Sequence, residues 1–214
     1  AEPSGAELKW FTFTDEGHLD LSQVDELITE RTKVVTLTWV SNMLGTINPI
    51  AEITRRAHEV GALVVVDASQ AAPQLPIDLG AMPEAERPDL IAFTGHKVVG
   101  PTGIGVLWGR RELLEELPPF LGGGEMILDV RRDGFTPNEV PWRFEAGTPP
   151  IAEMIGIVLR TEGFDTAFCA DGGQAVEAWR TERPDLILLD LMLPGMDGIE
   201  ICRTLRQESD VPIV

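Results

Sequence analysis

Two short apolar segments of the chain, residues 63–66 and 90–93, are each followed by polar side chains that could do chemistry. Those side chains are Asp67, Ser69 and Gln70 after the first segment, and Thr94, His96 and Lys97 after the second. Continuous apolar runs rich in β-branched residues are typical of buried parallel strands, whose carboxyl ends carry functional groups. We therefore expect two neighbouring strands to deliver an acid and an amine to one edge of a sheet.

An acid after one strand and a lysine after the next suit a site for pyridoxal phosphate (PLP). The Lys97 amine would form a Schiff base with the cofactor, and the Asp67 carboxylate would keep the ring nitrogen protonated so that the ring accepts electrons. Simpler interpretations stand beside this one. An aspartate after a strand is often a turn or helix-cap residue, and a single lysine is usually a solvated surface group.

The composition limits the class of protein. The 214 residues allow one large or two small domains, and a hydrophobic share of 43% is enough for a packed core. A formal net charge of -18 argues against a nucleic-acid partner. No apolar run approaches membrane-spanning length and no secretory signal is visible, so we expect a cytoplasmic protein without a membrane partner. Cys169 and Cys202 form no metal-ligand pattern, and a first residue other than Met suggests a start inside a longer protein.

The pattern up to residue 150 indicates an α/β fold with a mostly parallel sheet. The expected strands cover residues 9–13, 34–40, 63–66, 90–93 and, reversed, 104–108. The expected helices cover residues 22–30 with a Ser22–Asp25 capping box, 50–60 between an Asn48–Pro49 start and Gly61, and 110–117. Residues 118–150 are predicted to form a long ordered loop. His58, on the polar side of the second helix, is predicted to be solvated.

Five motifs carry a family resemblance. They are VDASQ, TGHKVVGPTGIGVLWGR, SNMLGTINPI, LGGGEMI and PWRFEAGTPP. Together, over residues 1–152, they resemble the SUF-type cysteine desulfurases, which are fold-type I PLP enzymes of the class V aminotransferase family. The resemblance implies part of a PLP-transferase large domain. It also implies a reaction that converts cysteine to alanine and passes sulfur to an acceptor protein for iron–sulfur cluster assembly.

The same resemblance assigns roles to individual side chains. It implies Lys97 as the Schiff-base lysine, Asp67 at the pyridine nitrogen, Gln70 at the ring hydroxyl, Thr94 and His96 at the cofactor phosphate, Asn42 at the substrate carboxylate, and Thr148 at the phosphate of a partner subunit in a homodimer. Other roles remain open for three of them. His96 and Asn42 could be turn residues, and Thr148 could be a loop hydroxyl.

The departures from the desulfurase pattern are as informative as the matches. In the family, a cysteine thiolate and an arginine follow the FEAGTP motif, and a phosphate-binding turn and a stacking aromatic ring precede the region seen here. None of these is present. Cys169 and Cys202 match no desulfurase cysteine, so we expect PLP binding without full turnover.

Residues 152–214 have a different character. The segment RPDLILLDLMLPGMDGIEICRTLR resembles the receiver domain of a response regulator, a flavodoxin-like fold. We expect helices over 151–163, 172–182 and 199–207, and strands over 166–169, 186–189 and 211–214. The resemblance implies Asp190 as phosphoacceptor for a histidine kinase, with Mg²⁺ held by Asp190 and the backbone carbonyl of Met192.

The receiver pattern is also incomplete. Its acidic pair, and the hydroxyl and lysine of later strands, are missing. Its first strand is missing too, which would leave the strands over 166–169 and 186–189 without their shared neighbour.

Two families therefore meet in one chain, with a join at residues 150–154 and no linker. We expect domains over 1–152, with 12 basic and 23 acidic side chains, and over 153–214, with 5 and 12. Three functional hypotheses follow: a PLP-binding desulfurase fragment, a phosphorelay receiver, and a composite chain with neither activity.

Overall fold

The computed structural model describes residues 5–98, 100 and 102–214. It divides into two compact units, one that extends to Val158 and one over residues 159–214. No helix in the described residues has the length and apolar character needed to cross a membrane.

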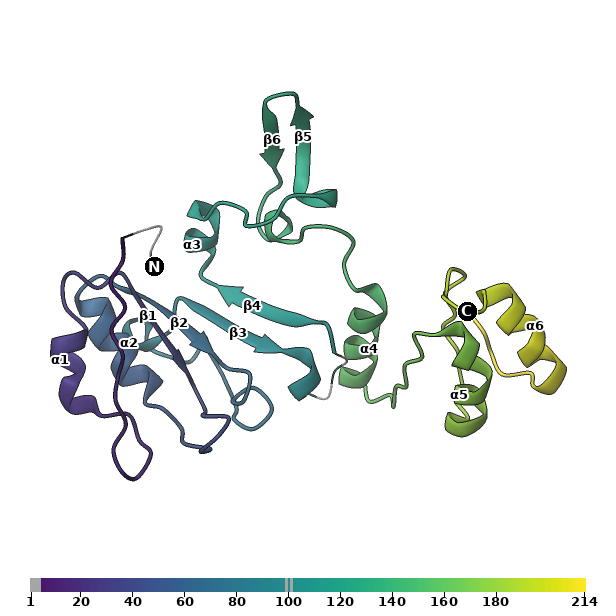
Figure 1. Cartoon of the computed structure of the whole chain (residues 1–214), viewed down its shortest axis with the longest axis horizontal. Coiled ribbons are helices and arrows are strands. Elements are labelled where there is room, and N and C mark those ends of the chain that lie inside the picture. The colour runs from purple at the N-terminus through teal and green to yellow at the C-terminus, as the bar shows by residue number, and fades with distance from the viewer. Residues whose placement is uncertain (1–4, 99, 101) are drawn as a thin grey trace. The chain divides into compact units, whose positions relative to one another are not determined.

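The first unit is built on a four-stranded sheet with the order β1 (Val34–Thr38), β2 (Leu63–Asp67), β3 (Leu90–Thr94) and β4 (Gly105–Gly109) (Figure 1). The first three strands run parallel, and β4 is antiparallel to β3. The prediction of a mostly parallel sheet with a reversed last strand is confirmed.

One amphipathic helix, α2 (Ile50–Glu59), packs against the sheet. Its buried face is the predicted stripe of Ile50, Ile53 and Ala57, which meets Val64 and Val66 of β2 in the core. Each large aliphatic side chain buried in this way contributes about 1.5–3 kcal/mol. The predicted cap is wrong. Asn48 is buried and its amide donates to the Thr38 carbonyl at 2.7 Å, so it closes the end of β1 rather than capping α2.

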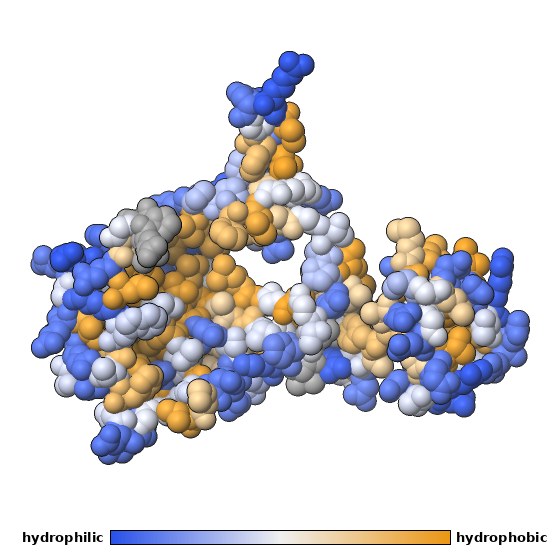
Figure 2. All heavy atoms as spheres, in the orientation of Figure 1, coloured by the Kyte–Doolittle hydropathy of each residue, from blue (hydrophilic) through white to orange (hydrophobic). Residues whose placement is uncertain are grey.

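The segment predicted as a long loop contains regular structure. It follows α3 (Arg111–Glu116) and includes a hairpin of β5 (Ile127–Arg131) and β6 (Gly134–Pro137), joined by a tight turn. Leu128 and Val130 of β5 are exposed. Figure 2 shows apolar atoms along one side of the hairpin, below a hydrophilic tip. The predicted edge strand over 9–13 is reduced to a single bridge between Phe13 and Leu19.

The first helical segment is shorter than predicted and is capped by a different residue. A 3-10 turn (Leu21–Gln23) leads into α1 (Val24–Leu27), and the cap is Asp20, whose carboxylate accepts from the Ser22 amide at 3.0 Å. At Ile28 the backbone becomes extended.

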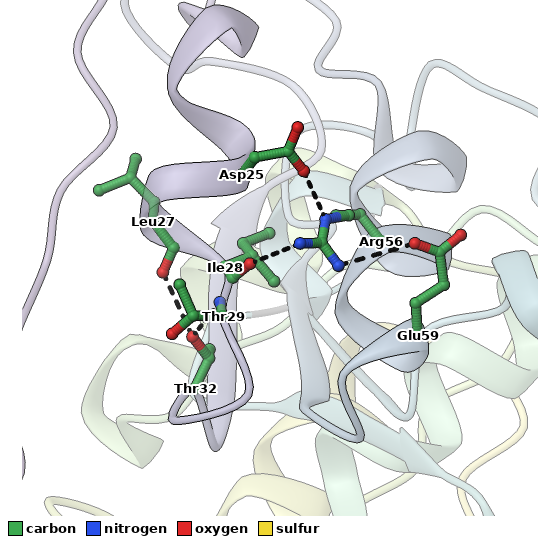
Figure 3. Close-up of polar contacts among 7 residues, drawn as sticks. All are labelled: Asp25, Leu27, Ile28, Thr29, Thr32, Arg56 and Glu59. Carbon is green, nitrogen blue, oxygen red and sulfur yellow. Dashed lines mark hydrogen bonds and ion pairs between the residues drawn. The ribbon is translucent and has the colours of Figure 1, made fainter.

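Arg56 of α2 bonds to the chain at the point where α1 ends. Its guanidinium donates to the Ile28 carbonyl at 3.0 Å and to Asp25 Oδ1 at 2.8 Å (Figure 3). The Ile28 carbonyl therefore bonds to α2 at the point where α1 stops.

The helix predicted over 151–163 is α4 (Ile151–Thr161), which runs through the expected join of the two families. The second unit adds α5 (Ala175–Glu182) and α6 (Gly198–Glu208), whose Trp179, Ile201 and Leu205 form its core. These helices confirm the predictions.

The strands predicted for the second unit do not form a sheet. Within residues 159–214, Ile187 and Ile213 form one isolated parallel bridge. Residues 166–169 have no strand partner there, and the Thr166 carbonyl accepts instead from the Arg160 guanidinium at 2.8 Å.

Candidate functional site

The parallel strands deliver the predicted polar groups to one edge of the sheet. Thr38 of β1 pairs with Asp67 of β2, and Asp67 pairs with Ala92 of β3. Asn42 follows Thr38 by four residues, and Lys97 follows Ala92 by five. Because the carboxyl ends of parallel strands meet at the same edge, the segments that carry Asn42, Asp67 and Lys97 all start from this edge.

The position of Asp67 is fixed by hydrogen bonds on both sides of it. Its carbonyl accepts from the Trp39 amide at 2.9 Å, and the next amide, of Ala68, donates to Ala92 at 2.8 Å. The exposed Asp67 carboxylate accepts from the Ser69 amide through Oδ1 at 2.8 Å. Asp67 is therefore a turn residue, an alternative that the sequence left open, and the hydrogen bond from the Ser69 amide also orients its carboxylate. Gln70 follows in the same turn and is half-buried.

Lys97 lies on a short turn that directly follows β3. This 3-10 turn (Gly95–Val98) is closed by Gly95, whose amide donates to Ile104 at 2.8 Å and whose carbonyl accepts from Gly100 at 2.9 Å. The Lys97 side chain is half-buried. Buried Gly95 thus anchors the turn and leaves the residues after it at the sheet edge.

Thr94 and His96, the predicted phosphate ligands, are brought together. Thr94 Oγ1 lies 2.6 Å from His96 Nδ1, and His96 is exposed. A hydroxyl and an imidazole N–H at a strand end are both donors suited to a phosphate.

Asn42 and Thr148 lie on loops outside the sheet. Asn42 is exposed in a turn that the Gly45 amide closes by donating to Ser41 at 3.0 Å. Thr148 is exposed and follows Gly147, whose amide donates to Gly123 at 3.1 Å. The substrate role of Asn42 and the partner-subunit role of Thr148 stay predictions.

In the second unit, Asp190 is exposed and its Oδ1 accepts from the Met192 amide at 3.0 Å. Among the residues that the structure describes, no group of three or more His, Cys, Asp or Glu side chains could hold a metal ion. Asp190 and the Met192 carbonyl remain a partial ligand set, and the Mg²⁺ prediction has no further support here.

Sequence reasoning missed a buried acid. Asp89, with 0% exposure, accepts from the Val64 amide at 2.6 Å and from His58 Nε2 at 3.0 Å. Its other oxygen, Oδ1, is matched by the charge of Arg110 rather than by an aligned hydrogen bond. The prediction that His58 is solvated is wrong, because the ring is paired with this acid and only 19% exposed. The cluster joins the starts of β2 and β3, at the sheet edge opposite Lys97.

The first unit thus has an α/β fold in which Asp67 and Lys97 come at the ends of two neighbouring parallel strands. Residues 1–180 match the family model of class-V aminotransferases, and the chain belongs to this family. Residues 148–214 match the response regulator receiver domain, so the two matches overlap over 148–180.

The relatives are cysteine desulfurases. The chain is 60% identical over 157 residues to a probable cysteine desulfurase of Streptomyces coelicolor, a match that covers 73% of this chain and 37% of the relative. The chain thus spans less than half the length of that relative. Among solved structures, it is similar to the cysteine desulfurase CsdA (S-sulfonic acid) of Escherichia coli (TM-score 0.64, 36% identity, 81% of this chain and 44% of that one). It is also similar to SspA in complex with cysteine (TM-score 0.59, 27% identity, 84% and 47%).

Proposed function

We propose that the first unit binds PLP through Lys97 and Asp67, as a cysteine desulfurase-like module. The observation that carries this proposal is the pairing register, which sets Asp67 beside the strand that leads to Lys97. A second observation supports it, since Thr94 and His96 are already paired at the end of that strand.

The cofactor, when bound, supplies an electron-accepting ring, and the chain supplies its placement. Asp67, oriented by the Ser69 amide, places a negative charge for the pyridine nitrogen. Lys97 offers its amine from the turn that Gly95 anchors, and Gln70 offers a donor to the ring hydroxyl. Thr94 and His96 offer donors to the phosphate, and Thr148 offers one to the phosphate of a second subunit in a homodimer.

We further propose cysteine as the amino acid that this site accepts, with Asn42 at its carboxylate. Support comes from the desulfurase relatives and from the similar structure described in complex with cysteine. Sulfur transfer to an acceptor protein needs a thiolate near the substrate. Both cysteines of this chain, Cys169 and Cys202, lie in the stretch that matches the receiver domain, so we infer binding without desulfurase turnover.

Reductive labelling tests the proposal. The chain has three lysines, Lys9, Lys33 and Lys97, so incubation with PLP followed by borohydride should add one pyridoxyl group, found on the peptide that contains Lys97. Lys97→Ala should remove the label, and the matched control Lys33→Ala, at an exposed lysine, should keep it. Equal labelling of all three lysines would contradict the proposal.

A second candidate function concerns the second unit. Asp190 is exposed at the end of a short extended segment, within the stretch that matches the receiver domain. We infer that it takes phosphate from a histidine kinase, with Mg²⁺ bound by its carboxylate. Incubation with acetyl phosphate and Mg²⁺ should add one phosphoryl mass, which Asp190→Asn abolishes and Asp185→Asn retains. An unchanged intact mass rules this function out.

A further inference from the structure

The segment 186–190 of the second unit is hydrogen-bonded along one edge. The Ile187 amide donates to Pro212 at 2.9 Å, the Ile187 carbonyl accepts from Val214 at 2.9 Å, and the Leu189 amide donates to Val214 at 2.8 Å. In an extended chain the backbone groups of successive residues point to opposite edges. The amides and carbonyls of Leu186 and Leu188 therefore face the other edge, and they have no backbone partner among the described residues.

The side chains along this segment also divide into a packed set and an exposed set. Ile187 and Leu189 pack against the core of α5 and α6, whereas Leu186 and Leu188 are each 50% exposed. Phe164, just before residues 166–169, and Phe168, within them, are 61% and 47% exposed. An unpaired strand edge with exposed apolar side chains is a template for another strand.

The chain contains an internal comparison for this edge. The hexapeptide ERPDLI occurs twice, at residues 86–91 and at residues 182–187. In the first copy, Leu90 and Ile91 belong to β3, which is paired on one edge by β2 and on the other by β4. In the second copy, Ile187 is paired on one edge only. The same sequence thus forms a strand with two neighbours where both are available.

We propose that the free edge of residues 186–190 binds an extended peptide strand with a continuous apolar centre and basic flanks, by β-strand addition. The apolar part would cover Leu186 and Leu188, and its backbone would pair with their amides and carbonyls. We infer the basic flanks from the net negative charge of the second unit. Residues 159–214 hold five basic and eleven acidic side chains, and exposed Asp185 and Asp190 bracket the edge. The same negative charge disfavours a second copy of this chain.

Amide hydrogen exchange of the full chain, with and without a blocked peptide of sequence KKVIVVIKK, tests the proposal. The pairing pattern predicts an alternating result. Saturating peptide should slow exchange at Leu186 and Leu188 by roughly tenfold or more, because their amides gain acceptors. Ile187 and Leu189, whose amides are already bonded, should change much less. No protection, or equal protection along the whole segment, would overturn the proposal.

Two controls separate strand addition from apolar adhesion. The same peptide with alternate amides N-methylated keeps its side chains but loses one hydrogen-bonding edge, and it should lose binding. Leu188→Pro removes the outward amide while leaving the bonds of Ile187 and Leu189, a change that edge strands tolerate. It should weaken binding at least about fivefold, the equivalent of one hydrogen bond, whereas Leu188→Ala keeps the amide and should bind.

The same controls give the results that would overturn the proposal. Equal binding of the N-methylated peptide would show adhesion only, and this result on the unmodified chain stands even if Leu188→Pro fails to fold. A concentration-dependent dimer that Leu188→Pro abolishes, without peptide binding, would assign the edge to a second copy and overturn the proposal.

Discussion

Asp67 lies directly opposite Ala92 in the parallel register of β2 and β3, and the Ala68 amide donates to the Ala92 carbonyl at 2.8 Å. Ala92 is five residues before Lys97, and the turn that carries Lys97 begins as soon as β3 ends. The acid and the amine are therefore positioned by two strands that are bonded to each other. Side-chain changes at this edge test the chemistry without removing the backbone bonds that hold it.

Asp67→Asn should weaken PLP binding by about 1–3 kcal/mol, because the amide keeps the bond from Ser69 but loses the charge that pairs with the ring nitrogen. The measurement is the PLP-induced rise in thermal midpoint, which reports binding to the native state. Asp78→Asn is a matched control, since exposed Asp78 also accepts a backbone amide, from Ala81 at 3.1 Å. A full PLP response in Asp67→Asn would contradict a role at the ring.

Gly100→Ala should disturb the turn that holds Lys97. A Cβ at this position would lie 2.8 Å from the Gly95 carbonyl oxygen and 3.1 Å from Ile157 Cγ1, so the turn must shift. Overpacking of this kind costs about 1–3 kcal/mol. Borohydride labelling of Lys97 at limiting PLP should fall, and Gly122→Ala, whose Cβ would meet the Phe135 ring at an ordinary 3.5 Å, should label like the parent chain. Undiminished labelling would mean that the turn does not position the amine.

Periodicity and strand order were enough to predict the sheet and the edge that gathers Asp67 and Lys97. They succeeded because α2 and β1–β3 bury continuous apolar faces. Such faces are recognisable from the spacing of apolar residues in the local sequence. The predictions failed where a distant group decides the outcome. Asparagine is a favourable helix-cap residue, but the Asn48 side-chain amide donates to the Thr38 carbonyl of β1 instead.

The repeated hexapeptide shows the same limit within one chain. Asp89 of the first copy is completely buried, and Asp185 of the second is exposed. What differs is the neighbourhood, because His58 and Arg110 come from elements outside the hexapeptide. No reading of local sequence could separate the two aspartates, and only the arrangement of the elements does.

Arg110→Ala should destabilise the first unit by about 3 kcal/mol, because it leaves the Asp89 carboxylate in the interior without its main counter-charge. The adjacent Arg111→Ala is the control, since its side chain is 69% exposed and pairs with Glu115 on the surface. Such a surface pair contributes about 0.5 kcal/mol or less. Hydrogen exchange at the amides of β2 measures the first unit separately from the second. Equal effects of the two changes would show that Asp89 does not depend on Arg110.

Arg180 and Glu208 tie α5 to α6 and give the second unit a dependence on pH. Arg180 donates to both carboxylate oxygens of Glu208, at 2.6 and 3.2 Å, and these hydrogen bonds hold the pKa of Glu208 below its ordinary 4.5. A carboxyl whose pKa is lower in the folded state contributes stability above its unfolded pKa, and that contribution is lost as pH falls through the folded value.

Exchange of the α6 amides should therefore accelerate as pH is lowered below 4.5, beyond the intrinsic pH dependence of exchange. Arg180→Gln should return the Glu208 pKa, followed by NMR of its side-chain carboxyl carbon, toward the ordinary value and remove this acid-induced loss. Arg203→Gln is the control, because exposed Arg203 lies on the same helix as Glu208 and is not a source of its shift. An unchanged Glu208 titration in Arg180→Gln would show that the ion pair does not persist in solution, and the two helices would then be held by the apolar cluster around Trp179, Ile201 and Leu205.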